Sequence, residues 1–383
     1  MEKEKYKDVV VIGSDHYNPL WVVRSLGMAG YAPTLLVIKD NGRHSYISKS
    51  RYVKQYFILK RDTEIISKLL SLNFPTKTAI IACSDSLAWV LDSNRDSLKK
   101  KYFVPGCGDR QGLLSMWQDK EKQKEAAIRA GLRVINGISI RLDEDYHILL
   151  NNIEFPCLIK PQNSSQADKT NFRICENLEH LNYCLDEVKK KCKEVLVQQY
   201  IKRDIEFNIL GARCGSNKEC VAPGGYYRTK MCTSLRNLGM PCYGYVKEQI
   251  HNGIDMDAWK KFVDEVDYDG LFSTEFLISG DEAYFLEMNL RDDGDLFYWT
   301  TAGVNLPAIW VSSLYGQDKD QLPKQFQKKV TYGMNEINYM KYQVSFRHLG
   351  ENIKDWWRCN CYTIFNLKDI RPFFYKFLYY VFK

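Results

Sequence analysis

Four side chains suited to binding a metal ion and a phosphate lie close together in the second half of the 383-residue chain. Two apolar-rich runs flank residues 279–282, Ser-Gly-Asp-Glu, a composition typical of a hairpin turn. Because side chains alternate between faces along a strand, Glu287, Asn289 and Arg291 share one face. Folding the two runs about the turn places Glu275 opposite Glu287 or one position away. We therefore expect two carboxylates, an amide and a guanidinium to converge.

These groups match the ligands that magnesium and phosphate prefer. Mg²⁺ takes oxygen ligands, commonly one or two carboxylates together with substrate phosphates, and arginine suits a bidentate phosphate contact. The alternative is a solvated strand face that carries a Glu–Arg pair. Buried acids require partners, and the apolar neighbours that indicate burial are Phe276, Phe285, Leu286 and Met288. The pattern alone leaves both interpretations open.

A lysine earlier in the chain is a candidate phosphate contact. Lys160 stands near the end of an apolar run, 155–161, and a polar loop of small residues, 162–169, follows it. A lysine in that place can reach a phosphate while backbone N–H groups of the loop add donors. Taken alone, Lys160 is better explained as an ordinary lysine at a sheet edge.

The first hundred residues predict an α/β fold with a doubly wound parallel sheet. Strand-like runs at 8–15, 33–38 and 78–82 alternate with helical patterns. Residues 13–15 lack GxGxxG spacing, so we interpret them as a strand-to-helix turn with a cap and not as a nucleotide fingerprint. Ligands of such sheets bind beyond the carboxyl ends of the strands, so we expect this lobe to hold the substrate.

The middle of the chain predicts the elements that carry the lysines. Residues 104–108 are rich in Pro and Gly and indicate a linker. Asp119 is a good N-cap and Gly131 a good C′ residue, which predicts a helix between them. Strands are expected near 155–160 and 195–201.

Composition limits the classes of function. The net charge of +7 suits acidic small molecules such as nucleotides, but Lys and Arg are spread along the chain, so we expect no nucleic acid partner. The twelve cysteines are scattered, which indicates buried thiols rather than disulfides or a zinc site. The N-terminus lacks a signal-peptide pattern and no 20-residue apolar run occurs, so we expect a cytoplasmic protein.

Residues near 115–315 resemble the ATP-grasp superfamily, in particular its carboxylate–amine ligases and carbamoyl-phosphate-synthase-like members. The likeness extends to D-aspartate-type and capsule-modifying ligases. The matching pieces occur in the family's order, which makes the resemblance specific. They are Asp119-Lys120 before a helix ending in Ala130-Gly131-Leu132, the strand 155–161, the hinge 198–201 with Glu206, and the segments 274–276, 286–291 and 302–307.

The resemblance implies a division of the chain. Residues 1–108 would form a pre-ATP-grasp, Rossmann-like domain. A two-lobed α+β ATP-grasp domain would follow, with its lid lobe at 109–200 and its metal and substrate lobe at 201–320. Residues 321–383 would be an aromatic, basic extension.

The resemblance also implies contacts with the phosphates of ATP. Lys120 and Lys160 would contact the phosphates directly. Ser164 and Ser165 lie in the loop that matches the family's phosphate cover, although this loop lacks the usual glycines.

The implied contacts with the nucleoside lie in and after the hinge. Gln198 or Gln199 would meet the adenine amino group, although the family often has Glu at the start of the hinge. The backbone of Tyr200 and Ile201 would meet the ring. Glu206 would hold the ribose or the adenine edge.

The resemblance implies that the hairpin residues bind the metal. Glu275, Glu287 and Asn289 would bind two magnesium ions, for which manganese can substitute. Arg291 would steady the transferring phosphoryl group.

Residues 224–241 carry basic residues and two tyrosines and resemble the variable substrate and phosphate loop of these ligases. Arg236 is the candidate there for a second catalytic anion contact. A solvated surface loop explains the segment equally well.

The implied reaction transfers the γ-phosphoryl group of ATP to a small-molecule carboxylate, and an amine then attacks the acyl phosphate. Such chemistry depends on positioning and charge stabilisation, which suits acids, an amide, lysines and an arginine. The resemblance suggests a role in amino-acid or cell-surface glycan modification. The alternatives are carboxylation, acid–thiol ligation and a non-catalytic ATP-binding regulator.

Residues 370–383 are unusually aromatic and basic. Packing against the body of the protein is the default interpretation of such a tail. A dimer contact and a peripheral contact with a membrane surface are the alternatives.

Overall fold

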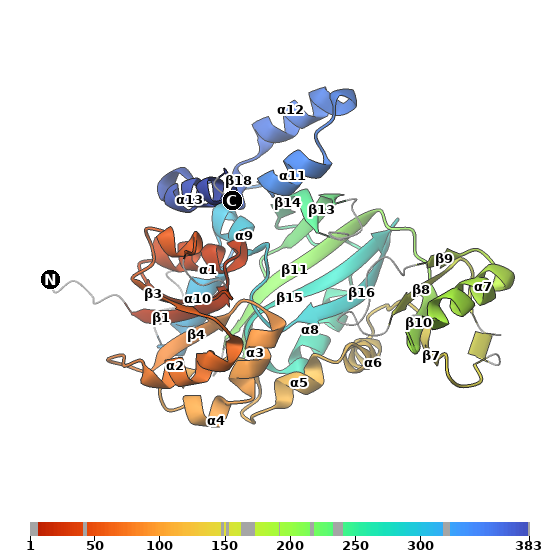
Figure 1. Ribbon diagram of the computed structural model, residues 1–383, viewed down its shortest axis with the longest axis horizontal. Helices are drawn as coiled ribbons and strands as arrows, with labels where there is room; N and C mark the ends of the chain where they lie inside the picture. The colour runs from red at the N-terminus through yellow and green to blue at the C-terminus, as the bar shows by residue number, and fades with distance from the viewer. Residues whose placement is uncertain are drawn as a thin grey trace.

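A computed structural model describes residues 7–40, 44–146, 149–150, 153–161, 173–190, 192–214, 218–232, 240–316 and 322–381. Figure 1 shows an N-terminal lobe at the left, a large central sheet, a small lobe at the right, and C-terminal helices along the top. Within the described residues, no helix is long and apolar enough to span a bilayer.

The N-terminal lobe is built around a five-stranded parallel sheet. In chain order its elements are β1 (Asp8–Ser14), α1 (Tyr17–Met28), β2 (Ala32–Ile38), η1 (Ile47–Lys49), β3 (Gln55–Leu59), η2 (Asp62–Glu64), α2 (Ile65–Ser71), β4 (Thr78–Ala82), α3 (Asp85–Asp92), α4 (Arg95–Leu98) and β5 (Tyr102–Phe103). The strand order is β3-β2-β1-β4-β5. Residues 9–12 in β1 are fully buried, as expected where both faces of a parallel sheet are covered. The predicted α/β fold with a parallel sheet is confirmed.

The segment predicted to be the lid lobe contains a small antiparallel sheet with its own apolar core, which includes Ile140, Ile159 and Leu185, and we keep the name lid for it. The elements of this region are α5 (Leu113–Trp117), α6 (Lys120–Ala130), β7 (Gly137–Arg141), β8 (Cys157–Pro161), β9 (Arg173–Cys175), α7 (Leu178–Lys189) and β10 (Glu194–Gln199). The strand order is β7-β10-β8-β9. Asp119 caps α6 and Gly131 ends it at φ 100°, as the sequence predicted.

The central sheet carries the hairpin and joins the other parts. Its strands are β6 (Gly106–Cys107), β11 (Ile205–Cys214), β12 (Glu219–Val221), β13 (Gly225–Met231), β14 (Pro241–Lys247), β15 (Tyr268–Ser279), β16 (Glu282–Asn289), β17 (Thr331–Met334) and β18 (Cys361–Tyr362). The main order is β16-β15-β11-β13-β14-β17-β18, with β12 paired to β11 and β6 to β15. Since β17 and β18 come from residues 321–383, part of the predicted extension completes this sheet.

Helices cover the central sheet and extend beyond it. They are α8 (Met256–Val266), α9 (Leu296–Ala302), α10 (Leu306–Leu314), α11 (Glu336–Tyr342), η8 (Phe346–His348), α12 (Leu349–Arg358), η9 (Leu367–Asp369) and α13 (Arg371–Val381). Phe262 on α8 packs in one apolar core with Phe276 and Phe285 of the hairpin. Trp310 on α10 lies in a second core, which also includes residues of β1 and α1. The first of these cores also includes Val10 and Ile12 of β1, so the hairpin packs in one core with the N-terminal lobe.

A buried ion pair ties the N-terminal lobe to the C-terminal segment. Arg24 on α1 is fully buried, and its Nε atom donates to Asp369 Oδ2 at 2.9 Å. Arg24 Nη2 donates to the Ile364 carbonyl oxygen at 2.8 Å. Asp369 also accepts from the Ser50 hydroxyl and the Arg51 amide, each at 2.8 Å. The charge of Asp369 thus depends on partners from the N-terminal lobe.

We expect Arg24→Met to lower the free energy of unfolding by about 3–5 kcal/mol, because it leaves the Asp369 carboxylate buried without its cation. Chemical denaturation followed by fluorescence measures this loss. Arg129→Met is the matched control, since the pair of Arg129 with Glu265 is largely exposed and is expected to contribute about 0–1 kcal/mol. Equal losses in the two variants would contradict the structural role of Arg24.

Candidate active site

The hairpin that the sequence predicts is formed by β15 and β16. Glu275 lies directly opposite Glu287 and Ser273 opposite Asn289, with a register shift just after Glu275. The side chains of Glu275 and Glu287 are 20% and 27% exposed, and Asn289 is buried. The structure therefore brings the two acids and the amide together, as the pairing across the turn predicted.

The oxygen atoms of the hairpin side chains could bind a magnesium ion together with phosphate oxygens. Burial, opposed by Arg228 and reinforced by Asp293 and Glu287, raises the pKa of Glu275 to about 7. A cation beside Glu275 and Glu287 would relieve this unfavourable crowding of acids. Among the described residues, no three His, Cys, Asp or Glu side chains are grouped to hold a metal unaided. Phosphate oxygens would therefore have to complete the ligand set, as is common for magnesium.

Arg291 connects the hairpin to the N-terminal lobe. Asn289 Nδ2 donates to Ser273 Oγ at 3.3 Å and to Glu275 Oε1 at 3.4 Å. Its Oδ1 atom accepts from Arg291 Nη2 at 3.1 Å. Arg291 Nε donates in turn to Asp85 Oδ1 at 3.1 Å, at the start of α3. The predicted phosphoryl contact thus lies where the two lobes meet.

Both predicted phosphate lysines lie at the hairpin. Lys120, the first residue of α6, forms an ion pair with Glu287. Burial and the nearby charge of Lys120 lower the pKa of Lys160, while Glu287 opposes that effect. Lys160 comes from β8 of the lid, so the lid and the hairpin approach each other at these lysines. Two cations beside two acids form a site suited to phosphates and a metal ion.

The hinge residues lie at and just after the end of β10, an inner strand of the lid sheet. Gln198 and Gln199 are the last residues of β10 and are partly exposed. The Tyr200 amide donates to the Pro156 carbonyl oxygen at 2.8 Å, so its N–H group is engaged within the hinge. Ile201 follows, also partly exposed. The contacts of these residues with adenine remain predictions.

A buried arginine that the sequence analysis did not single out organises the acids. Arg228 on β13 is 7% exposed and donates through Nη2 to Asp295 Oδ2 at 2.7 Å. Three more carboxyl groups lie within 4.0 Å of its guanidinium: Glu275, Glu206 and Asp293. Glu206 therefore faces this cluster, and its contact with ribose or adenine remains a prediction. The sequence did contain a sign of this cluster: three acids lie within residues 292–295, directly after the hairpin, and buried acids require a cation nearby.

Residues 224–241 do not form one loop, and that interpretation was wrong for the first half of the segment. Residues 225–231 form β13, in which Tyr226 and Tyr227 are buried. Both rings pack against neighbouring aromatic residues, edge-on, tilted or stacked, and these contacts favour their burial. Arg228 can be buried between acids because they neutralise its charge.

Three predicted site residues lie outside the described part of the chain. Ser164 and Ser165 fall within residues 162–172, and Arg236 falls within residues 233–239.

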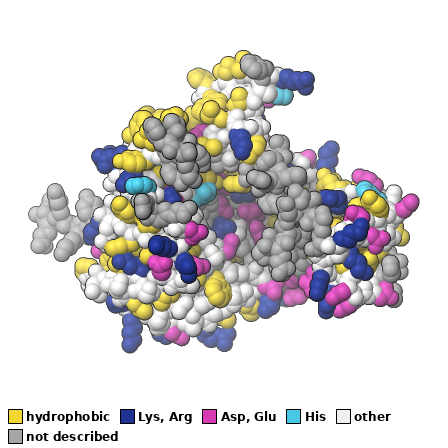
Figure 2. Space-filling model, viewed as in Figure 1, with side chains coloured by type: hydrophobic (Ala, Val, Ile, Leu, Met, Phe, Trp, Pro, Cys, Tyr) yellow, Lys and Arg dark blue, Asp and Glu magenta, His cyan; other side chains and the backbone are white. Residues whose placement is uncertain are grey.

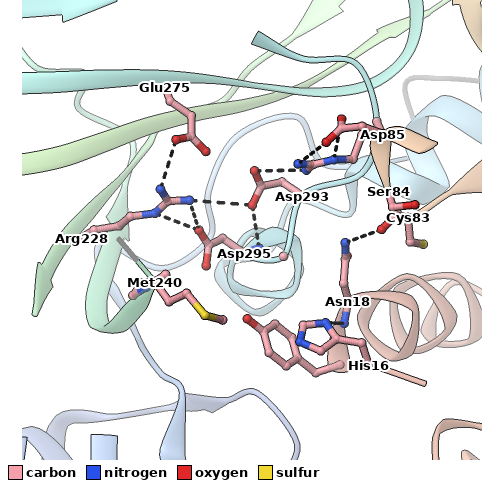
Figure 3. Close-up of a pocket in the computed structure, with 14 residues that line it drawn as sticks. His16, Asn18, Cys83, Ser84, Asp85, Arg228, Met240, Glu275, Asp293 and Asp295 are labelled. Carbon is pink, nitrogen blue, oxygen red and sulfur yellow. Dashed lines mark hydrogen bonds and ion pairs between the residues drawn. The ribbon is translucent and has the colours of Figure 1, made fainter. Parts of the chain in front are cut away.

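A pocket of about 310 Å³ opens where the N-terminal lobe meets the acid cluster (Figure 3). One side is formed at the carboxyl ends of β1 and β4, where His16 and Ser84 cap α1 and α3. These strands are neighbours at the point where the strand order reverses, the usual place for a ligand. The lining residues are His16, Tyr17, Asn18, Cys83, Ser84, Asp85, Arg228, Met240, Pro241, Glu275, Arg291, Asp293, Gly294 and Asp295.

Among curated proteins, the chain is similar over part of its length to a formyltransferase and to a ligase. No family model matches the chain. The formate-dependent phosphoribosylglycinamide formyltransferase of Saccharolobus solfataricus is 26% identical over 184 residues, 45% of each chain. The D-alanine–D-alanine ligase of Wigglesworthia glossinidia brevipalpis is 27% identical over 115 residues, 29% of this chain and 32% of its own. The chain thus matches less than half the length of these relatives.

Solved structures share the fold over most of the chain. The N5-carboxyaminoimidazole synthetase of Staphylococcus aureus, complexed with ADP, has a TM-score of 0.64 at 16% identity, covering 88% of this chain and 84% of that chain. The biotin carboxylase domain of the Hydrogenobacter thermophilus 2-oxoglutarate carboxylase, in complex with MgADP, has a TM-score of 0.60 at 17% identity, covering 86% and 74%. The resemblance of the chain to the ATP-grasp ligases is therefore confirmed.

We expect Glu275→Gln to change the pH dependence of stability. An acid whose pKa is higher in the folded state holds its proton more tightly there, so the wild type loses stability as the pH rises from 4.5 to about 7. The variant lacks this loss, and its free energy of unfolding should exceed that of the wild type by on the order of 1–3 kcal/mol at about pH 8 and differ little at about pH 5. Urea denaturation without nucleotide measures both values.

Glu265→Gln is the control for this experiment, because Glu265 lies on the exposed side of α8 and forms an exposed ion pair with Arg129. It should change stability little at either pH. A gain for Glu275→Gln that is equal at both pH values would contradict the crowding of acids around Glu275.

Proposed function

We propose that the protein is an ATP- and magnesium-dependent ligase that joins a carboxylate to an amine. The observation that carries the proposal is that two lysines lie beside the acids of the hairpin: Lys120 pairs with Glu287, and Lys160 lies near both. These cations would hold the ATP phosphates while the hairpin acids hold magnesium. Proteins of the same fold that are complexed with ADP support the binding of a nucleotide.

The nucleoside would lie along the hinge between the lid and the central sheet. Gln198 or Gln199 would accept from the adenine amino group, and the backbone at Tyr200 and Ile201 would contact the ring. Glu206 would contact ribose or the adenine edge. These assignments rest on the order of the motifs, and the hinge position beside β8 and β10 is compatible with them.

The proposed reaction has two steps. An oxygen of the substrate carboxylate attacks the γ-phosphorus of ATP, the bond to the bridging oxygen breaks, and ADP leaves. The amine nitrogen then attacks the acyl carbon, the carbon–oxygen bond to phosphate breaks, and the amine gives up its proton to water or a nearby carboxylate. Positioning and neutralisation of charge are what the protein must supply for such a transfer.

The chain's own residues would provide that charge. Magnesium held by Glu275, Glu287 and Asn289 would offset the negative charge of the phosphates, and we propose two ions, which manganese can replace. Arg291 would hold the transferring phosphoryl group, because its guanidinium already bridges the hairpin and α3.

The pocket in Figure 3 would hold the acid and the amine beside the phosphoryl group. Four carboxyl groups and two guanidinium groups line it, so acids are in excess. Burial and the nearby charge of Lys376 lower the pKa of His16 to about 4, so this side chain adds no positive charge at neutral pH. A surplus of acids favours an amine, which is cationic before it reacts, and the arginines suit its carboxylate partner. Amino-acid-sized substrates fit this description, as they would in amino-acid or cell-surface glycan modification.

We expect Glu287→Gln to abolish magnesium-dependent release of ADP from ATP in the presence of pooled carboxylates and amines. Loss of one metal carboxylate should lower the rate by about a hundredfold or more, since charge stabilisation dominates phosphoryl transfer. A coupled assay for ADP measures the rate, and separating the pool identifies the substrates.

Glu282→Gln is the control, because Glu282 lies at the exposed start of the same strand and pairs with Arg133. It should retain wild-type activity. Release of ADP with bicarbonate or a thiol but with no amine would favour the carboxylation or acid–thiol alternatives. Binding of ATP with no turnover in any pool would favour a regulator.

We expect Met240→Trp to raise the KM for the pocket substrate by about tenfold or more while the Kd for MgATP stays the same, since the larger ring occupies space in the pocket. Met240 points into the pocket in Figure 3 and has no proposed role in chemistry. Steady-state kinetics and nucleotide titration separate the two constants. Equal weakening of both would place the substrate elsewhere.

A further inference from the structure

Helix α12 turns two polar residues, Asn352 and Asp355, inward and exposes most of its apolar residues to solvent. Asn352 is buried and bonds to Tyr339, while Asp355 bonds to Tyr339 Oη and to Lys230 Nζ, each at 2.6 Å. The outward face carries Leu349, Ile353 and Trp357, at helical spacing. Trp356 is less exposed, and its ring packs against Tyr339 and Tyr362. Trp357 is 87% exposed and Ile353 61%. A helix on the surface of a globular protein normally packs its apolar face against the core. The apolar face of α12 instead lies open to solvent.

The neighbouring helices continue this exposed surface. Ile337 and Met340 on α11 and Phe374 and Phe377 on α13 are also exposed. Figure 1 shows α11, α12 and α13 along the same side of the molecule, and Figure 2 shows apolar side chains gathered there. We call the exposed apolar side chains of these three helices the C-terminal face. Exposed apolar residues clustered on this scale mark an interaction surface.

The exposed charges around the C-terminal face are mostly positive. Between residues 336 and 378, the exposed Lys and Arg residues are Lys341, Arg347, Lys354, Arg358, Lys368 and Arg371. Glu351 is the one exposed acid of the same range. The other acids face inward: Glu336 accepts from the Thr363 and Ile364 amides, and Asp369 is paired with Arg24. Apart from Glu351, the fold thus keeps the acids of this segment in its interior and leaves the basic residues exposed.

We propose that the C-terminal face docks on a membrane surface that carries anionic lipid headgroups. Outward aromatic and aliphatic side chains flanked by Lys and Arg are what an interfacial helix presents: the apolar groups enter the boundary of the acyl chains and the cations meet the headgroups. The contact is peripheral, since no helix of the described residues is long and apolar enough to span the bilayer.

Charge favours the membrane over a second copy of the chain as the occupant. A two-fold dimer through this face would bring the same surface of both copies together. The exposed basic residues would then lie opposite one another, and like charges across an interface weaken it. An anionic bilayer instead complements every one of them.

Co-sedimentation of the full chain with vesicles tests this proposal. We expect binding to phosphatidylcholine vesicles that contain phosphatidylserine and far weaker binding to pure phosphatidylcholine. Binding should fall as salt rises from about 0.1 M to about 1 M, because the screening length shortens from about 10 Å to about 3 Å. The assay needs neither ATP nor substrate, so its outcome is independent of the ligase activity.

Two sets of variants assign the contact to the C-terminal face. Ile353→Glu combined with Trp357→Glu should reduce partition into the anionic vesicles by about tenfold or more, and Tyr183→Glu, at a side chain 66% exposed on α7, should leave it unchanged. Lys354→Glu should weaken binding to the anionic vesicles, while Lys100→Glu, at an exposed site after α4 on the opposite side of Figure 1, should not. All five positions are exposed, and equal melting temperatures confirm that each variant is folded.

Failure of the wild type to bind the anionic vesicles would overturn the proposal. Undiminished binding by the Ile353/Trp357 double variant would also overturn it, since the contact would then lie elsewhere. Analytical ultracentrifugation covers the rival occupant: a dimer that dissociates in the double variant would assign the face to a second copy.

Discussion

The Arg228 guanidinium is the interaction on which the candidate site depends. It lies within 4.0 Å of carboxyl groups from β11, from β15 and from the segment after β16. Removing a charge from a buried cluster of this kind leaves its partners uncompensated, which is far more costly than losing a surface pair. Arg228 therefore offsets the repulsion among four carboxyl groups that lie in one small region, those of Glu206, Glu275, Asp293 and Asp295.

Even with Arg228 present, the acids remain crowded. Burial raises the pKa of Glu275 to about 7 and that of Asp295 to about 6, against the lowering effect of Arg228. Such carboxyl groups reduce stability at neutral pH but gain from an added cation. The repulsion among these acids would favour the proposed ligands, because magnesium and a cationic amine would each supply positive charge. Unfavourable electrostatics in the free protein would thus become affinity for ligands.

The C-terminal segment joins the pocket to the proposed membrane surface. Its strands β17 and β18 complete the central sheet, and Asp369 is fixed by Arg24 of the N-terminal lobe. Lys376 on α13 is close enough to His16, which lines the pocket, to lower the pKa of that histidine. The interior side of this segment therefore supports the site, while its exterior carries the apolar and basic face. The default interpretation of an aromatic tail, packing on the body, accounts for its inner residues only.

The sequence by itself determined the features that depend on neighbouring residues. The parallel strands of the first lobe, the ends of α6 at Asp119 and Gly131, and the pairing of Glu275 with Glu287 to within one position follow from local backbone preferences and from strand periodicity. The exact register, with its shift just after Glu275, came from the structure. Only the tertiary structure decided the surroundings of Arg228, because its partners come from segments far apart in the chain. It also decided the direction of α12, since helical spacing shows that Trp357 and its neighbours share a face but not whether that face points inward or outward.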